Sequence, residues 1–245
     1  MISTGGHLTI LESVDSTNNY AMARLRTGLA NHGDGFFAMT QVNGKGQRGK
    51  TWLTERGTNI IITLVMRPAG LQLLRQFQLS IAIALAAHDF YVHYAGDETS
   101  IKWPNDIYWR DRKAGGILIE SIVGSSASAD SSQEPTTQDS RLTTTSSWQW
   151  AVIGMGININ QTAFPDQIRN AVSLKQITGK DWDVIELAKE LCGYVQNRYG
   201  QLLAGTDLLA EYNDRLYKRG ERVKFKKGSL VFEGMVKEVN VQVNW

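Results

Sequence analysis

The most constraining feature of the sequence is the segment 101–120, in which one lysine stands in a proline-containing turn between two apolar runs. The turn reads Lys-Trp-Pro-Asn-Asp over residues 102–106. Pro104 fixes its own φ angle and disfavours helical geometry in the residue before it. Asn105 and Asp106 are residue types that hydrogen-bond to nearby backbone and tighten turns. We therefore expect Lys102 to be held at a fixed place, where its ammonium can meet an anion such as a carboxylate beside a phosphate.

Length and composition indicate a globular protein. The 245-residue chain is 42% hydrophobic and can bury a large core, so we expect one large domain and one small one. A formal net charge of +2 argues against bulk electrostatic binding to nucleic acid. The single cysteine, Cys192, cannot form an internal disulfide and lies in an apolar helical pattern, so we expect it to fill the core of a cytosolic protein.

Neither a long apolar run nor a basic leader is present in the sequence. This predicts a cytoplasmic protein without a membrane segment. The four histidines lack the spacing of metal ligands, so no zinc site is expected.

The apolar periodicity predicts a mixed β-sheet with helices, an α/β (α+β) fold. Expected strands cover 7–12, 36–42, 59–66, 101–103, 116–123 and 148–153, and expected helices cover 17–28, 71–94, 183–204 and 206–218. Two short β segments follow, at 222–226 and 230–239. The Ser/Thr-rich residues 124–147 have no apolar pattern and predict a mobile hairpin insertion. We expect the large domain to cover 1–215 and a small β segment to cover 216–245.

The glycine-rich loop Gly44–Thr51 matches two nucleotide-binding patterns at once, G-x-x-x-x-G-K-T and G-x-G-x-x-G. Both patterns need a helix directly after the loop, whose amides hold the phosphate. Residues 52–57 leave room for about one helical turn before a β-branched strand, so neither pattern is favoured. The loop can still direct backbone amides into a concavity, with positive charge from Lys45, Arg48 and Lys50.

These pieces occur in one order along the chain: Ser-Thr-Asn at 16–18, the stretch from Gln41 to Trp52, the Lys102 turn, then Gly-Ile-Leu-Ile-Glu at 116–120 and Gly-Met-Gly-Ile-Asn at 154–158. Over roughly residues 10–160 this order resembles the biotin protein ligases. The resemblance implies a catalytic domain like those of class II aminoacyl-tRNA synthetases, with biotin and MgATP as substrates. It also implies two half-reactions, formation of biotinyl-5′-AMP and transfer of the biotinyl group to a lysine of a biotin carboxyl carrier protein.

By position in the motifs, the resemblance assigns roles to individual residues. Lys102 is implied to join the biotin carboxylate and the α-phosphate as a catalytic residue, with Arg48 beside it. The biotin-binding residues implied are Ser16, Thr17, Asn18, Gln41, Gly44, Lys45, Trp52, Lys102 and Gly116. The ATP or adenylate-binding residues implied are Lys45, Gly46, Gln47, Arg48, Lys50, Trp52, Asn105, Lys113 and Asn158. Mg²⁺ is expected to bind the ATP phosphates, and the sequence identifies no protein ligand for it.

The chemistry of these residue types agrees with the implied roles. A neutral ureido ring needs hydroxyl and amide partners, which Ser16, Thr17 and Gln41 offer, although Ser16 and Thr17 also suit a plain helix cap. Trp52 and glycines 115, 116, 154 and 156 could form apolar walls around the bicycle. Glu120 is expected to form an ion pair at a strand end, and Asp106 to cap its turn.

The chain departs from the family pattern in two places. Gln47 stands where the family commonly has Arg, which leaves Arg48 as the expected substitute. The C-terminal segment covers about half of the small SH3-like barrel that family members usually carry. We also expect no DNA-binding function, because no helix-turn-helix precedes residue 10.

Three alternatives remain open. A lipoate ligase of the same superfamily would also adenylate a carboxylate with the help of a lysine. A P-loop NTPase would hydrolyse nucleotide without a carboxylic acid and would carry a helix right after Thr51. A non-catalytic biotin-binding module would not release pyrophosphate.

Overall fold

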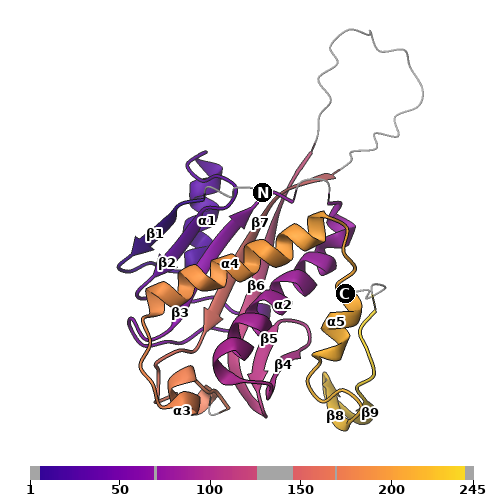
Figure 1. Ribbon diagram of the computed structural model, residues 1–245. Helices are drawn as coiled ribbons and strands as arrows, with labels where there is room; N and C mark the ends of the chain where they lie inside the picture. The colour runs from indigo at the N-terminus through magenta and orange to yellow at the C-terminus, as the bar shows by residue number, and fades with distance from the viewer. Residues whose placement is uncertain (1–5, 69–70, 126–145, 169, 241–245) are drawn as a thin grey trace, which may run out of the picture.

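The computed structural model describes residues 6–68, 71–125, 146–168 and 170–240, and its centre is one seven-stranded sheet (Figure 1). The strands are β1 (Leu8–Leu11), β2 (Gly35–Ala38), β3 (Ile60–Met66), β4 (Thr99–Lys102), β5 (Asp106–Trp109), β6 (Arg112–Ser125) and β7 (Ser146–Ile157). Their order across the sheet is β1-β2-β3-β7-β6-β5-β4. β1 pairs with β2 in parallel and every other pair is antiparallel, which confirms the predicted mixed sheet.

Helices cover both faces of this sheet. α2 (Gln76–Ala95) and α4 (Val184–Leu203) lie side by side across one face, and α1 (Thr17–Arg26) packs on the other (Figure 1). β3 is buried throughout because its alternate side chains enter two different cores. Ile62 packs with α2 and α4, whereas Val65 packs with Ala21 of α1.

Several element boundaries differ from the predictions. The long helix predicted from residue 71 begins at Gln76, after a 3-10 turn η2 (Leu73–Arg75), and the helix predicted over 206–218 is only α5 (Leu209–Asp214). β5 was not predicted: Asp106 opens this strand and does not cap the turn. The short elements η3 (Asp166–Ile168) and α3 (Leu174–Thr178) also had no predicted counterpart, because each is shorter than two helical turns.

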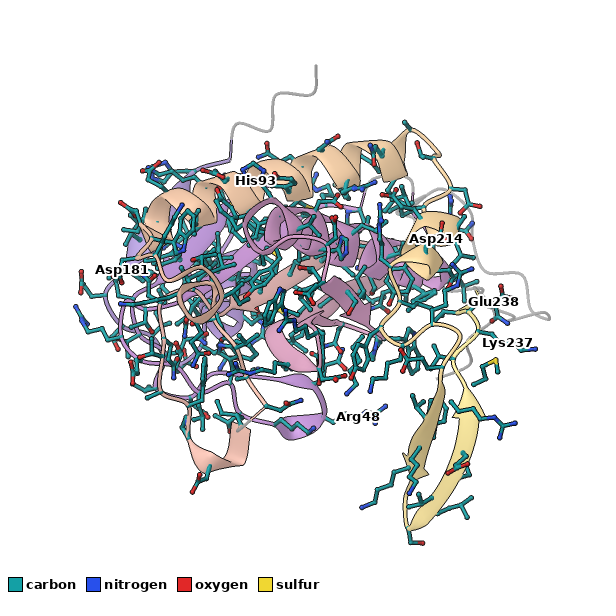
Figure 2. The ribbon with its side chains drawn as sticks, turned by 60° about the horizontal axis from the view of Figure 1, so that its bottom comes forward. Arg48, His93, Asp181, Asp214, Lys237 and Glu238 are labelled. Atoms are coloured by element: carbon teal, nitrogen blue, oxygen red, sulfur yellow. The ribbon has the colours of Figure 1, made fainter. Side chains whose placement is uncertain are left out.

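After residue 220 the chain forms a separate two-stranded sheet of β8 (Arg222–Lys227) and β9 (Leu230–Met235). This hairpin extends away from the rest of the chain (Figure 2). It is the small β segment that the pattern predicts, and the domain division at residue 216 remains a prediction. Of the predicted insertion over 124–147, residues 126–145 lie outside the described residues, while Gly124 and Ser147 pair within β6 and β7.

No helix in the described part of the chain combines the length and the apolarity that a membrane crossing needs.

Candidate functional site

A cavity of about 50 Å³ opens on the α1 face of the sheet, where the start of α1 and the glycine-rich loop meet β6 and β7. Its lining residues are Ser16, Thr17, Asn18, Gln41, Lys45, Gly46, Gln47, Trp52, Ile61, Asn105, Asp106, Lys113, Gly116, Ile117, Leu118, Gly154, Met155 and Gly156. Five segments of the sequence thus contribute to one cavity.

The start of α1 supplies neutral polar groups to one end of this cavity. Ser16 is the N-cap residue and is 1% exposed, but its side chain makes no capping hydrogen bond, so the plain capping role is wrong for it. The backbone amide and the hydroxyl of Thr17 donate to Gln41 Oε1 at 2.8 and 3.1 Å. Because Gln41 Oε1 accepts these bonds, its amide nitrogen is the group turned toward the loop, against Gly44.

Buried Thr63 on β3 fixes the next residue of α1. Its hydroxyl oxygen lies 2.6 Å from Asn18 Oδ1 and 2.8 Å from Thr17 Oγ1. An amide oxygen can only accept, so the Thr63 proton is directed at Asn18. Asn18 Nδ2 in turn donates to Glu120 Oε2 at 2.8 Å, which fixes both ends of the Asn18 amide.

Glu120 links this network to the glycine-rich loop. Its other carboxylate oxygen, Oε1, lies 3.7 Å from Lys45 Nζ. The predicted ion pair of Glu120 is therefore present, but the residue stands in the middle of β6 and not at a strand end.

The glycine-rich loop folds back on itself as a narrow two-stranded strap. Trp52 N donates to Gly44 O at 2.9 Å and Gly46 N donates to Lys50 O at 2.7 Å. The tip is a 3-10 turn, η1 (Gln47–Gly49), in which Arg48 has a φ of +56°. Arg48 is exposed at the surface of the molecule (Figure 2). Lys45 and Gln47 line the cavity.

Trp52 closes the middle of the cavity by lying across two glycines. A Cβ atom added to Gly156 would be 2.4 Å from Trp52 Cε2, and one added to Gly116 would be 3.2 Å from Trp52 Cζ3. Only glycine permits such close approach of an indole to the strands. Trp52 Nε1 is buried and has no hydrogen-bond partner within the described residues, so it remains available to a ligand.

The far end of the cavity holds an ion pair. Lys113 Nζ lies 2.7 Å from Asp106 Oδ1 and 5.5 Å from the centre of the Trp52 ring. Both charged groups flank Gly116, whose added Cβ would lie 3.2 Å from Lys113 Nζ and 3.3 Å from Asp106 Oδ1. β5 and β6 pair Asp106 with Gly116, which places all three side by side.

Lys102 does not line this cavity. Its ammonium donates to the Tyr108 hydroxyl at 3.1 Å and lies 4.6 and 5.6 Å from the ring centres of Tyr108 and Tyr217. Lys102 lies away from the cavity because it is on β4, the edge strand, and β5 stands between β4 and β6. The cavity lining therefore does not include Lys102, whose expected role stays a prediction, and Lys113 is the lysine that the fold brings to the cavity.

Other predicted residues also lie outside the cavity lining. Asn158 is 4% exposed and donates to the backbone oxygens of Lys113 and Val172, so its side chain ties strands to a loop. Lys50 and Arg48 are exposed on the strap, and Gly44 borders a neighbouring groove. Gly115 faces Ile157 on the opposite side of the sheet and is not a wall of the cavity.

Sequence reasoning missed the apolar wall and the support beneath it. Ile61, Ile117, Leu118 and Met155 line the cavity, and Thr63 lies under α1. Strand alternation was the signal that could have found Ile61, Thr63 and Leu118, because Ile61 and Thr63 share a face of β3, and Gly116 and Leu118 share a face of β6. Ile117 and Met155 belong to the core on the other face of the sheet, so alternation does not predict them at the cavity.

The loop geometry excludes both phosphate-loop patterns. Residues 52–55 have no regular secondary structure, and no helix stands between Thr51 and β3, a stretch that the structure describes completely. The helix N-terminus that either pattern requires is thus missing after this loop.

The site offers little for direct metal binding. Among the residues described, no group of three or more His, Cys, Asp or Glu side chains is placed to hold a metal ion. Near α1, the hydrogen bond from Asn19 lowers the pKa of Asp15, which keeps this carboxylate ionised before the helix.

The sequence is similar to proteins of one known family. Residues 10–131 match the biotin/lipoate A/B protein ligase family. The bifunctional ligase/repressor BirA of Escherichia coli (strain K12) is 34% identical over 120 residues, covering 47% of this chain and 35% of that protein. The biotin–[acetyl-CoA-carboxylase] ligase of Mycobacterium tuberculosis is 26% identical over 241 residues, covering 96% of this chain and 80% of that protein. The chain thus spans about a third of the Escherichia coli relative and most of the mycobacterial one.

The fold is similar to that of a biotin protein ligase from Aquifex aeolicus in complex with biotin and ATP. The TM-score is 0.71 at 24% sequence identity, covering 94% of this chain and 86% of that chain. This likeness concerns the arrangement of helices and strands.

Proposed function

We propose that this chain, which belongs to the biotin/lipoate A/B protein ligase family through residues 10–131, is a biotin–protein ligase. In the proposed reaction it activates biotin with ATP to biotinyl-5′-AMP and then transfers the biotinyl group to a lysine of a biotin carboxyl carrier protein.

The observation that carries this proposal is the order of chemical groups along the cavity. Neutral hydroxyl and amide groups from Thr17 and Gln41 stand at one end, Trp52 and the strand glycines form the middle, and the Lys113 ammonium stands at the other end. Biotin has the same order of parts: a neutral ureido ring, an apolar body and chain, and a carboxylate. A buried polar group without a partner costs about 1–3 kcal/mol, so this match favours biotin over a ligand without a polar head.

Lys113 is the residue we propose to bring the two anions together. The carboxylate oxygen of biotin bonds to the α-phosphorus of ATP, the bond from that phosphorus to the bridging oxygen breaks, and pyrophosphate leaves. A fixed ammonium at 2.7 Å from Asp106 offsets the repulsion between carboxylate and phosphate. Lys102, on the edge strand, then serves to pack against Tyr108 and Tyr217.

We place the adenosine of ATP in the groove next to the cavity. This groove has a volume of about 540 Å³ and shares Gln41 and Trp52 with the cavity. Residues 51–55 and most of residues 161–165 are among those that line it. Phe164 supplies an aromatic ring for a base to stack on. Lys45 lines the cavity, and exposed Arg48 and Lys50 remain the proposed helpers at the phosphates.

Mg²⁺ fits this site as a companion of ATP. The two carboxylates nearest the cavity, Asp106 and Glu120, are each already paired with a lysine. We therefore propose that Mg²⁺ is bound by the ATP phosphates, where it neutralises charge on the triphosphate.

Ligand binding requires the strap to move. A cavity of about 50 Å³ is smaller than biotin, and Trp52 fills much of the space between Gly116 and Gly156. The tip of the strap is exposed, so the strap is the element that we propose to open.

The test is a pyrophosphate-release assay with biotin, lipoate or no acid, followed by transfer to a purified carrier domain. We expect release only with ATP and biotin together, and a labelled carrier lysine afterwards. Release with lipoate in place of biotin would favour a lipoate ligase. Biotin binding without release would favour a non-catalytic module, and nucleotide hydrolysis without any acid would favour an NTPase. A carrier partner and both soluble substrates suit a cytoplasmic location, which we also propose.

The adenosine placement has its own test. We expect Phe164→Ala to raise the KM for ATP while the KM for biotin stays unchanged.

A further inference from the structure

A second cavity, of about 230 Å³, adjoins the first at the end where Lys113 stands. The two cavities share Gln47, Asn105 and Ile117 as lining residues. Beyond these, the second cavity is bounded by the first turns of α2, by Pro104 and by the face of β6 that is turned toward α2. A group in the second cavity would therefore reach the first one beside Asn105, next to the Asp106–Lys113 pair.

The chemistry of this second cavity excludes phosphate as its occupant. All of its lining residues are uncharged, so a phosphate entering it would have no cation to replace its hydration. The walls are partly apolar, from Phe77, Ile117 and Ile119, and partly polar, from Gln76, Ser80 and Asn105. An apolar stem ending in a neutral polar group fits such a lining.

The polar groups are turned so that they can accept hydrogen bonds. Asn105 Nδ2 donates to Ile117 O at 2.6 Å, and Gln76 Nε2 donates to Ser121 Oγ at 3.1 Å. Each amide nitrogen uses one of its two N–H groups in these bonds, and the amide oxygens can receive an N–H group. The rim residues Gln47, Gln76 and Ser80 are only half-buried, so the cavity is reached from the surface.

We propose that this second cavity is the channel through which the acceptor lysine reaches the acyl-adenylate, an inference that rests on the proposed ligase function. The four-carbon stem lies against Phe77 and Ile119, and the amine points past Asn105 toward the acyl carbon. A neutral lining disfavours the ammonium form, so the lysine loses its proton to water as it enters. The amine nitrogen then bonds to the acyl carbon, the bond from that carbon to the AMP oxygen breaks, AMP leaves as an anion, and the second amine proton is released to solvent.

The test uses a substitution that fills the channel and leaves the residues of the first cavity unchanged. Ser80→Leu adds an apolar side chain at the rim of the channel, and α2 should tolerate it because Leu is a good helix former. Ser80→Ala is the matched control, because it removes only the hydroxyl. The unmodified protein and both variants are loaded with biotin and ATP, and pyrophosphate release is measured first. Each loaded protein is then given either a carrier domain or hydroxylamine, a nucleophile small enough to pass a narrowed channel.

We expect Ser80→Leu to slow transfer to the carrier by at least about tenfold, while its pyrophosphate release and its capture by hydroxylamine stay within about twofold of the unmodified protein. Ser80→Ala should transfer normally. If Ser80→Leu fails to fold, Ile119→Phe is the substitute variant, because it narrows the channel from the side of the sheet. It should also slow transfer to the carrier while leaving pyrophosphate release and hydroxylamine capture unchanged.

Two results would overturn the inference. Normal transfer by both filled variants would show that the lysine arrives elsewhere, and an equal loss of release, transfer and hydroxylamine capture would show that the channel is not separate from the first cavity. If the unmodified protein released no pyrophosphate with biotin, the proposed function itself would fail and this inference with it.

Discussion

The ammonium of Lys113 on β6 lies 2.7 Å from the carboxylate of Asp106 on β5, and the pair stands over Gly116 at one end of the cavity. Both side chains are partly buried, with 33% and 24% exposure, so the pair is screened less than a surface ion pair. A cation held in this way is oriented before any ligand arrives, which is the property that stabilising a transferring phosphoryl group requires.

Lys113→Ala should therefore lower biotin-dependent pyrophosphate release by about 100-fold or more, the size of effect seen when a single preorganised charge donor is lost. Lys102→Ala should change release by less than about threefold, because its exposed contacts with two tyrosines are worth roughly 0.5–1 kcal/mol. The opposite result, a severe loss at Lys102 and a mild one at Lys113, would restore the prediction made from the motif.

Gly156→Ala should weaken biotin binding by at least about tenfold, because the new Cβ would lie 2.4 Å from the Trp52 ring and must displace it. Titration calorimetry with biotin gives the affinity, and tryptophan fluorescence reports the position of the indole. Gly193→Ala is the control: it lies on the exposed side of α4 with no neighbour within 4 Å of an added Cβ, and it should stabilise the fold by about 0.5–1 kcal/mol. Unchanged biotin affinity in Gly156→Ala would contradict the proposed position of Trp52.

Thr63→Val should reduce biotin affinity although Thr63 does not line the cavity. The substitution keeps the shape of the side chain but removes the hydroxyl that contacts Asn18 and Thr17, and a buried acceptor left without its partner costs about 1–3 kcal/mol. Thr63→Ser retains the hydroxyl and should bind biotin with near-normal affinity. Equal weakening in both variants would point to packing and not to the hydrogen bond.

Gln47→Arg should slow the dissociation of the adenylate more than it changes biotin affinity. Gln47 lines both cavities at the strap, so a guanidinium there can reach the phosphate but not the ureido end of the ligand. The check is the rate of loss of bound biotinyl-5′-AMP after gel filtration. The same rate in both proteins would refute this role.

Burial raises the pKa of Cys192 to about 11. Since only the thiolate reacts, at pH 8 roughly one thiol in a thousand is reactive in the folded protein, against about one in ten at the ordinary value of 9.0. Iodoacetamide should therefore label Cys192 slowly in buffer and much faster in urea, and its labelling in buffer should accelerate as the pH rises toward 11. Rapid labelling of the folded protein at pH 8 would show that the thiol is accessible, contrary to its expected place in the core.

Local patterns were sufficient for most of the sheet and for the two long helices. β3 and α4 were predicted within one residue at each end, because a run of β-branched residues and a 3.6-residue apolar period each favour one structure strongly. β5 was missed because its four residues directly follow the turn and continue its motif, so local chemistry favoured a longer turn. The short α5 was overestimated because an apolar period does not show where a helix ends.

The residue types of the site were determined by the sequence alone: the hydroxyl and amide segment at 16–18, the glycine-rich loop, the strand glycines and a lysine near residues 102–113. Which lysine lines the cavity was decided only by the tertiary structure. Lys102 and Lys113 lie in the same motif, but the order of strands puts β4 at the edge of the sheet and β6 at its interior, next to β7. Strand order depends on pairings between residues far apart in the chain, and these pairings leave no local pattern in the sequence.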